Sequence, residues 1–421
     1  MDGFPQWTVG GSGVSATVFP PKQLGHGFRT HSTPVGLYRS SRFDWLSIVG
    51  SIRVPTPEGG SVVLCGSAQP PPHDPYAPNY GVGLASEFGC GLHGTFCPPT
   101  DLGESDLTRS KQSRTKKTRP ASTYITNGVF GYGDAGPGGT FLKLGVGKLQ
   151  RPMNAADGTA GYNLSYPYKL VEQPQSQVRL LNCSRVHRGP ELSLCASYGR
   201  WSAVEMQSTV RHRNWGFRIR RRIRPCGEPD GKQGSGALCV DVRLVNLGEY
   251  ALTTPYMVAN LFNVQGAPSV GPGYSVSFGL QGAQRYKDVP DSRPIEAVAV
   301  LQLREDGKPS DIMFARELPE HQRAMASFRA PDPEWNGGFT IAMPADAGRS
   351  VVVTHSMHVE QVSESQRKYI SDPIPTHSWY GFNVHATKRS VAPRPYSLLT
   401  LPKDTSLQWT HRYDFSWRYD F

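Results

Sequence analysis

The sequence LCVDVRLVNLGEYALTTPYMVANLFNVQGAPSVGPGY runs from Leu238 to Tyr274 and contains the clearest strand pattern in the chain. Residues 239–246 alternate strictly between apolar and polar types, which is typical of a strand with one buried face. Residues 246–249 are polar and include a glycine, so they predict a turn. A second strand is expected over residues 253–264, before an exit rich in glycine and proline.

The composition of the whole chain favours many short strands over helices. The 421 residues include 45 Gly and 36 Pro, and no long run has helical spacing. A chain of low complexity is excluded, because 8 Trp, 18 Tyr and 17 Phe supply enough aromatic surface to fill a core. The formal net charge of +11 favours anionic partners, such as nucleic acid, an acidic polysaccharide or a phosphorylated sugar.

The cysteines and the N-terminus bear on the compartment. Seven cysteines at irregular spacings, with no CxxC pair, predict reduced thiols, no disulfide framework and no zinc site. No apolar stretch approaches the length of a membrane span, and the first residues lack the pattern of a secretory signal. We therefore expect an intracellular, cytoplasmic protein that is soluble and needs no cofactor.

Several separated segments carry a resemblance to a known family. Residues 42–45 read RFDW, residues 138–151 read GGTFLKLGVGKLQR, and the C-terminal region ends in a W-x-x-x-Y-x-F pattern at Trp409, Tyr413 and Phe415. With the frame of Asn246, Gly248 and Phe262, they resemble the galactose mutarotase (aldose 1-epimerase)-like superfamily. The closest likeness is to an uncharacterised branch with RFDW and KxGVG segments.

The resemblance implies an all-β fold, a β-supersandwich of two large, mostly antiparallel sheets with a concave sugar-binding face. In that family, the stretch around residues 238–264 is a central hairpin. The expected organisation is an irregular segment at residues 1–37, a single domain at 38–415 and a short tail at 416–421. A basic insertion over residues 101–123 is expected to be a solvated loop, a nuclear address or a contact for a polyanion.

Two catalytic positions of the family are replaced. Ala259 stands where the resemblance implies an acid histidine, and Arg394 stands where it implies a base glutamate. Mutarotation requires one group to protonate the ring oxygen and another to remove the anomeric proton. The sequence therefore predicts little mutarotation by the family's own pair of groups.

Other residues are candidates for catalysis or sugar binding. Glu87, Asp44 and His358 are the candidate catalytic groups. Arginine forks bind carboxylates or sugar hydroxyls, a Trp face stacks on a sugar ring, and glycines beside Lys143 let a ligand approach the backbone. The candidate substrate-binding residues are Arg42, Trp45, His73, Lys143, Arg218, Arg220, Arg222, Asn260 and Arg394. The alternative interpretation is structural: an Arg–Asp pair, a core tryptophan and a glutamate that caps a turn in the loop at residues 70–94.

Residues 211–224, RHRNWGFRIRRRIR, place arginines along one face of an expected strand. The other face carries Phe217, Ile219 and Ile223, interrupted by Arg221. We expect this strand to pair with residues 239–246, where Asp241 neutralises part of the row. The row is an exposed basic face, a groove for a uronic acid or sulfated glycan, or a nucleic-acid surface. Nucleic acid is disfavoured because the aromatics do not interleave with the arginines.

Residues 350–359, SVVVTHSMHV, predict a further strand, with His355 on the apolar face and His358 on the polar face. Three functions remain open at this stage. The first is a carbohydrate-active, aldose 1-epimerase-like protein, with an isomerase or lyase activity that uses other acid and base groups. The second is a non-catalytic glycan-binding or structural protein, and the third is a polyanion or nucleic-acid binder.

Overall fold

The computed structural model describes residues 6–10, 13–20, 41–44, 46, 48–64, 66, 82–90, 129–132, 135–153, 166–181, 200–226, 235–267, 269–279, 284–285, 293–303, 309–320, 322–329, 335–346, 348–360 and 375–419. These residues form 26 β-strands and one 3-10 helix, Ile295–Ala297, and contain no α-helix. Within these ranges, no helix has the length and hydropathy needed to cross a membrane.

The largest sheet, called sheet A, contains 12 strands. Its main path is antiparallel except that β1 pairs in parallel with β11, and the side strand β18 pairs in parallel with β21. In spatial order the path is β11 (Arg200–Trp201), β1 (Trp7–Gly10), β2 (Ser15–Phe19), β3 (Ile48–Pro55), β5 (Leu84–Phe88), β15 (Leu252–Asn260), β25 (Ser390–Leu401), β24 (Thr376–Thr387), β21 (Arg323–Arg329) and β17 (Gln284–Arg285), with β4 (Ser61–Leu64) beside β3 and β18 (Arg293–Pro294) beside β21.

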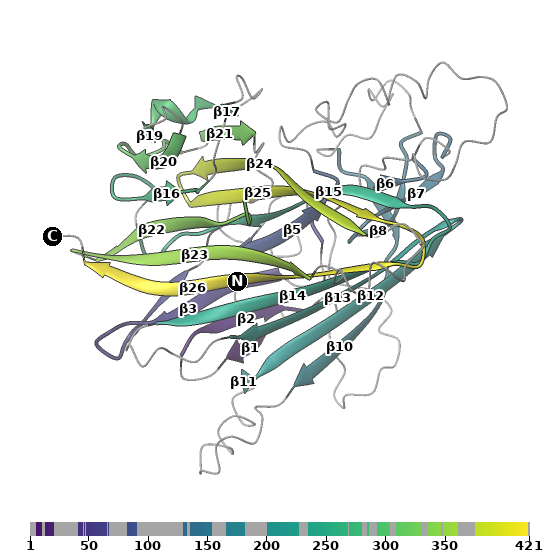
Figure 1. Cartoon of the computed structure of the whole chain (residues 1–421), viewed down its shortest axis with the longest axis horizontal. Coiled ribbons are helices and arrows are strands. Elements are labelled where there is room, and N and C mark those ends of the chain that lie inside the picture. Colours follow the sequence, from purple (N-terminus) through teal and green to yellow (C-terminus); the bar gives the residue numbers. More distant parts are fainter. Residues whose placement is uncertain are drawn as a thin grey trace, which may run out of the picture.

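The second large sheet, sheet B, contains 10 strands, and every neighbouring pair is antiparallel. Figure 1 shows its long central strands running side by side across the molecule. In spatial order they are β10 (Gln175–Leu181), β12 (Ala203–His212), β13 (Trp215–Pro225), β14 (Gly236–Asn246), β26 (Ser406–Tyr419), β23 (Arg349–Glu360), β22 (Phe339–Asp346), β16 (Ser275–Ser277), β20 (Pro309–Phe314) and β19 (Ala299–Leu303).

A small third sheet, sheet C, lies at one end of the molecule (Figure 1). It consists of β6 (Val129–Phe130), β7 (Thr140–Lys143), β8 (Gly147–Gln150) and β9 (Lys169–Glu172). Phe141 and Leu149 pack against Met257 and Tyr396 on the face of sheet A that points away from sheet B. We call this face the outer face of sheet A.

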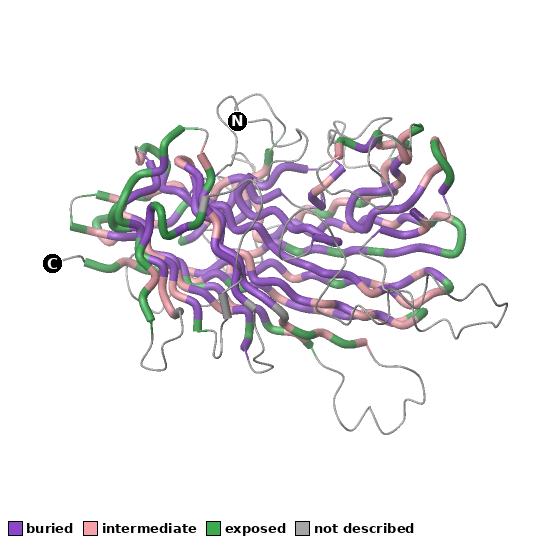
Figure 2. The backbone as a smooth tube through the Cα atoms, turned by 90° about the horizontal axis from the view of Figure 1, so that it is seen from above, coloured by how far each residue is buried: buried purple, intermediate pink, exposed green. Residues whose placement is uncertain are grey.

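The predicted fold class is confirmed: the chain is all-β, with two large, mostly antiparallel sheets packed face to face. The main core lies between them and contains Val258 and Leu399 from sheet A together with Ile219 and Trp409 from sheet B. Figure 2 shows the buried residues along the strands, while the exposed ones gather at turns and strand ends. This is the arrangement that alternating side chains in two stacked sheets require.

The turn predicted at residues 246–249 is present, but it does not close a hairpin. β14 belongs to sheet B and β15 to sheet A, so the expectation of a central hairpin is wrong. The Asn246 side chain accepts from the Gly248 amide at 2.9 Å and donates to the carbonyl oxygens of Tyr250 and Leu401. A Cβ at Gly248 would lie 2.7 Å from the Asn214 carbonyl oxygen, so only glycine fits here.

Three expectations about loops are also corrected. Residues 7–10 and 15–19 form β1 and β2, although the N-terminal segment was expected to be irregular. Residues 84–88 form a central strand, β5, inside the predicted loop. The sequence contains no sign of it, because both faces of β5 are buried and its residues do not alternate between apolar and polar types. Side-chain types alternate over residues 140–147, which is typical of one strand, but these residues turn back into the β7–β8 hairpin.

Two further expectations concern the C-terminus and the cysteines. β26 continues to Tyr419, so residues 416–419 extend the sheet and are not a tail. Cys226 and Cys239 form a disulfide across the β13–β14 pair, so the prediction of reduced thiols is wrong for them. Strand pairing, which spacing alone does not reveal, brings these two cysteines together. The basic insertion at 101–123 lies outside the described residues.

A buried ion pair joins the two large sheets. Arg221 lies on the core side of β13, and its Nη2 is 2.7 Å from Oδ2 of Asp44, with both side chains at most 1% exposed. The Asp44 amide donates to Ser86 O of β5 at 2.8 Å, which attaches this carboxylate to sheet A. A buried charge requires such a partner, because an isolated ion in the core carries a large desolvation penalty.

We predict that Arg221→Ala lowers the free energy of unfolding by about 3–5 kcal/mol, because it leaves the Asp44 carboxylate buried without its counter-ion. The double variant R221M/D44L should recover most of this loss, since both charges are then removed. Urea denaturation of the three proteins measures the effect, with Arg53→Ala on the exposed side of β3 as the control. A loss below about 1 kcal/mol for Arg221→Ala would contradict the structural role of the pair.

Candidate functional site

The outer face of sheet A carries a cluster of polar side chains where β5, β15, β25 and β24 lie side by side. Glu87 is paired in register with Met257, which is paired with Tyr396, and Tyr396 with Gly381. Two residues before Tyr396 on β25, Arg394 is paired with Asn383 of β24. Strands are about 4.8 Å apart, so these side chains share one surface.

Glu87 is fully buried and is held by an arginine from outside the sheet. Its Oε1 accepts from Nε of Arg42 at 2.9 Å, and the Arg42 guanidinium lies over the Phe43 ring. Lys143, also fully buried, donates from Nζ to the Phe88 carbonyl oxygen at 2.9 Å. Two segments far apart in sequence, one with RFDW and one with KxGVG, therefore meet beside β5.

A second contact joins the same two segments. Gly145 has a φ of +79°, and a Cβ there would lie 2.8 Å from Cβ of Asp44. A larger residue in the turn between β7 and β8 would push Asp44 away from Arg221 and disturb Arg42 two residues earlier. The glycine is thus needed for both its conformation and the close approach.

The other side of the cluster contains polar atoms without hydrogen-bond partners in the described ranges. They are Nε of Arg394, Nδ1 of His385, Oδ1 of Asn383 and Oε2 of Glu87. Asn383 does donate from its amide nitrogen to Ser327 Oγ at 2.8 Å, which orients its Oδ1. Buried polar atoms in proteins nearly always have partners, so these four atoms leave hydrogen-bonding capacity unused on one face.

Burial favours the neutral forms of the histidine, cysteine and tyrosine near Glu87. Burial, followed by the positive charges of Arg394, Arg323 and Arg42, lowers the pKa of His385 well below its usual value. Burial and the Glu87 carboxylate raise the pKa of Cys90 to about 12, and burial raises the pKa of Tyr396 well above 10. The formally charged groups of the cluster are Arg42, Lys143, Arg394 and Glu87, and Arg323 acts on His385 from β21.

Two positions to which the sequence resemblance assigns catalytic groups, Ala259 and Arg394, lie on this face. Ala259 follows Met257 on the same side of β15 and packs with Ala85 and Ala392. Arg394 lies on the next strand, β25.

His385 is a member of this cluster that was not predicted from the sequence. It lies on β24, in register with Ala392, and its side chain is 8% exposed. The available signal was alternation in residues 382–386, FNVHA, where Phe382, Val384 and Ala386 face the core and Asn383 and His385 face the other way.

The structure separates the predicted site residues into three places. Arg42, Glu87, Lys143 and Arg394 meet on the outer face of sheet A. Arg218, Arg220, Arg222 and His358 lie on the exposed face of sheet B, on the far side of the sandwich. Asp44 and Asn260 lie between the sheets, and Trp45 and His73 lie outside the described residues.

Asn260 has a complete set of structural partners between the sheets. Its amide nitrogen donates to the Pro393 and Val258 carbonyl oxygens, and its Oδ1 accepts from the Tyr413 hydroxyl at 2.8 Å. These bonds join β15, β25 and β26. The contacts of this side chain are those of a core amide that ties the two sheets together.

A buried chain of hydrogen bonds also crosses the core. His355 Nε2 lies 3.0 Å from His411 Nδ1, and His411 Nε2 lies 2.8 Å from the Tyr256 hydroxyl. His355 Nδ1 lies 3.2 Å from the Gly337 carbonyl oxygen, so the predicted assignment of His355 to the core is confirmed. Burial lowers the pKa of His355 to about 3, and burial followed by the charges of His355 and Arg221 lowers that of His411 well below 6.5.

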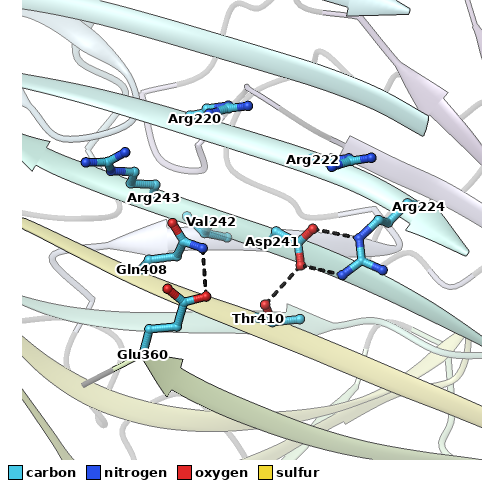
Figure 3. Close-up of a pocket in the computed structure, with 9 residues that line it drawn as sticks. All are labelled: Arg220, Arg222, Arg224, Asp241, Val242, Arg243, Glu360, Gln408 and Thr410. Carbon is cyan, nitrogen blue, oxygen red and sulfur yellow. Dashed lines mark hydrogen bonds and ion pairs between the residues drawn. The ribbon is translucent and has the colours of Figure 1, made fainter. Parts of the chain in front are cut away.

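The predicted arginine row is confirmed on sheet B. Arg218, Arg220 and Arg222 are exposed and Arg224 is half-buried, while Phe217, Ile219, Arg221 and Ile223 are buried. β13 pairs with β14 as expected, and Arg224 makes two hydrogen bonds with Asp241, at 2.8 and 3.2 Å. Figure 3 shows the surface groove that these strands form with β26 and β23.

Comparison with known proteins gives a likeness at the level of the fold. No protein-family model matches the chain, and no curated protein matches it in sequence. Among solved structures, the chain is similar to the Slr1438 protein of Synechocystis sp. PCC 6803, with 10% identity, coverage of 98% of this chain and 96% of that one, and a TM-score of 0.41.

Two further structures carry titles that name the superfamily. The GalM/aldose epimerase homologue from C. elegans is 8% identical, with 98% of this chain and 99% of that chain covered and a TM-score of 0.34. A galactose mutarotase-like protein from Clostridium acetobutylicum is 13% identical, with coverage of 90% and 94% and a TM-score of 0.26. At these TM-scores the likeness carries no argument about the fold or the site of this chain.

We predict that the chain loses stability as the pH falls from about 7 to about 4. The folded-state pKa values of His355, His385 and His411 lie below the unfolded value near 6.5, so the unfolded chain binds more protons in this range. Their stabilising contribution is present above the unfolded pKa and is lost as the pH falls towards the folded one. Urea denaturation at a series of pH values measures the slope.

His355→Gln should make this slope shallower, because one buried neutral imidazole no longer has to be protonated on unfolding. His358→Gln, three residues away on the exposed face of the same strand, is the matched control for the substitution itself. A stability profile of the wild-type chain that is flat between pH 4 and 7 would contradict the assignment.

Proposed function

We propose that the protein binds a sugar bearing an acidic group on the outer face of sheet A. The observation that carries this proposal is the set of four polar atoms without described partners on that face: Glu87 Oε2, Asn383 Oδ1, His385 Nδ1 and Arg394 Nε. Two of these are oxygen acceptors and one is a cationic donor. The hydroxyl groups of a sugar can donate to the two oxygen acceptors, and an acidic group on the sugar can accept from the arginine.

The charge of the site supports the choice of an acidic sugar. Arg42, Lys143 and Arg394 contribute three positive charges, and Glu87 contributes one negative charge, so two positive charges remain in excess. Arg42 is already paired with Glu87, which leaves Arg394 as the guanidinium available to an anionic ligand. Arginine binds carboxylate and phosphate groups through two parallel hydrogen bonds, which gives both affinity and orientation.

The same residues disfavour the two-group mutarotation of the superfamily. Ala259 and Arg394 cannot transfer protons as the expected histidine and glutamate would. Glu87 is the one carboxylate in the cluster, and His385 has a pKa too far below neutrality for an efficient general acid. We therefore infer a binding role for the site, with an epimerase-like reaction as the second candidate.

One observation favours that second candidate. Glu87 Oε2 and His385 Nδ1 both lack partners in the described ranges and lie on one face, so together they could serve as a rewired base and acid. Slow mutarotation would require one of these groups to remove the proton of the anomeric hydroxyl and the other to protonate the ring oxygen.

We predict that Arg394→Gln weakens the binding of galacturonate or glucuronate about tenfold and leaves the weak binding of the neutral parent sugars unchanged, because one charge-assisted contact is lost. Titration calorimetry with acidic and neutral sugars measures this effect. Arg53→Gln, which removes an exposed arginine from sheet A, is the control. Equal binding of acidic and neutral sugars by the wild-type chain would contradict the proposal.

Polarimetry separates the binding role from the enzymatic candidate. We expect the wild-type chain to leave the rate of mutarotation of a freshly dissolved uronic acid at its value in buffer. An acceleration that disappears in Glu87→Gln, with binding retained, would instead establish the enzyme.

A further inference from the structure

The exposed face of sheet B carries a groove that the proposed sugar site does not use. Its volume is about 440 Å³, and it lies on the far side of the sandwich from Glu87. The lining comes from four neighbouring strands, β13, β14, β26 and β23 (Figure 3). The lining residues are Arg220, Arg222, Arg224, Asp241, Val242, Arg243, Glu360, Gln408 and Thr410.

The groove has more positive charge than its own carboxylates neutralise. It contains four guanidinium groups and two carboxylates, a formal excess of two positive charges. Asp241 forms an ion pair with Arg224 and also accepts a hydrogen bond from Thr410 at 2.9 Å. Glu360 accepts one from Gln408 at 2.8 Å.

Among the described residues, the side chains of Arg222 and Arg243 form no ion pair, because the carboxylates opposite Arg222, Glu205 and Asp241, are paired with Arg220 and Arg224. The Arg243 guanidinium donates to Ser406 Oγ at 3.3 Å. Arg220 has Glu205 as a partner, but it lies directly opposite Arg243 in the β13–β14 register. Like charges in directly opposed positions destabilise a sheet, so an anion between them would relieve the repulsion.

The spacing of the arginines suits a chain of anions better than a single small anion. Arg218 is exposed on the same face as Arg220 and Arg222, and successive members are two residues apart. At about 3.3 Å per residue, the three guanidiniums are spread over roughly 13 Å of strand. One small ion cannot contact such a row, whereas a polymer with repeated acidic groups can.

The other lining groups favour a sugar polymer over a nucleic acid. Asp241, Glu360, Gln408 and Thr410 place oxygen acceptors beside the arginines, and the hydroxyl groups of a polysaccharide donate to such acceptors. The lining contains no aromatic ring, whereas proteins that bind single-stranded nucleic acid stack the bases on aromatic side chains.

We propose that this groove binds an acidic polysaccharide, a sugar chain that carries repeated sulfate or carboxylate groups. Arg222 and Arg243 bind its acidic groups, Arg218 and Arg220 extend the contact along β13, and Glu360 and Gln408 bind its hydroxyls. The central strands fix the backbone positions of these groups, while the exposed arginine side chains are ordered on binding. The proposal is independent of the sugar site on sheet A, because the two surfaces share no residue.

The test compares matched variants with defined probes. The double variant R222Q/R243Q removes two charges from the groove, and R53Q/R316Q removes two exposed charges from other parts of the surface. The probes are a heparin-derived oligosaccharide, an oligogalacturonate, a neutral dextran oligosaccharide, and single-stranded DNA and RNA of similar length. Titration calorimetry at about 0.15 M salt gives the affinities, and a salt series gives the electrostatic contribution.

We expect the wild-type chain to bind the sulfated or the uronate probe more tightly than the DNA, the RNA or the neutral probe. R222Q/R243Q should weaken that binding by about tenfold for each lost charge-assisted contact, while R53Q/R316Q leaves it within about twofold. The preference between sulfate and carboxylate probes identifies the acidic group.

Several results would overturn the proposal. Equal losses in R222Q/R243Q and R53Q/R316Q would mean that net charge alone attracts the probes. Tighter binding of DNA or RNA than of either acidic sugar would assign the groove to nucleic acid. Binding of no probe at about 0.15 M salt would leave the arginines as a solvated face.

Discussion

The ion pair between Arg221 and Asp44 is the constraint on which the rest of the structure depends. Every neighbour of Arg221 on the core side of β13 is apolar, so its charge must be matched inside the sandwich. Asp44 can match it only because the segment before β3 enters the core and is attached to β5. Removing either partner would leave the other as an uncompensated charge in a dry core.

This pair also fixes the position of the proposed sugar site. Asp44 faces Arg221 between the sheets, and Arg42, two residues earlier, reaches Glu87 on the other side of sheet A. The glycine in the turn of sheet C contacts Asp44, so the small sheet is placed against the same point. One short segment thereby couples the sandwich, the small sheet and the polar cluster.

The two surfaces proposed for ligands differ in their physical design. The cluster on sheet A is largely buried, so its affinity for a sugar would come from the few polar atoms that the protein leaves without partners. The groove on sheet B is open, so its affinity would come from charge and would depend on salt. A protein with both surfaces could hold an acidic polysaccharide on one face of the sandwich and a single acidic sugar on the other.

The sequence by itself determined the all-β class, the alternation of the arginine row and the burial of His355. These follow from side-chain type and a period of two, which are local properties. Only the tertiary structure decided which sheet each strand joins, because alternation gives the face of a residue but not the identity of the neighbouring strand. For that reason the sequence predicted a loop where β5 lies and did not identify His385. It also named Arg222 and Glu87 as candidates for a sugar site, although they lie on opposite faces of the molecule.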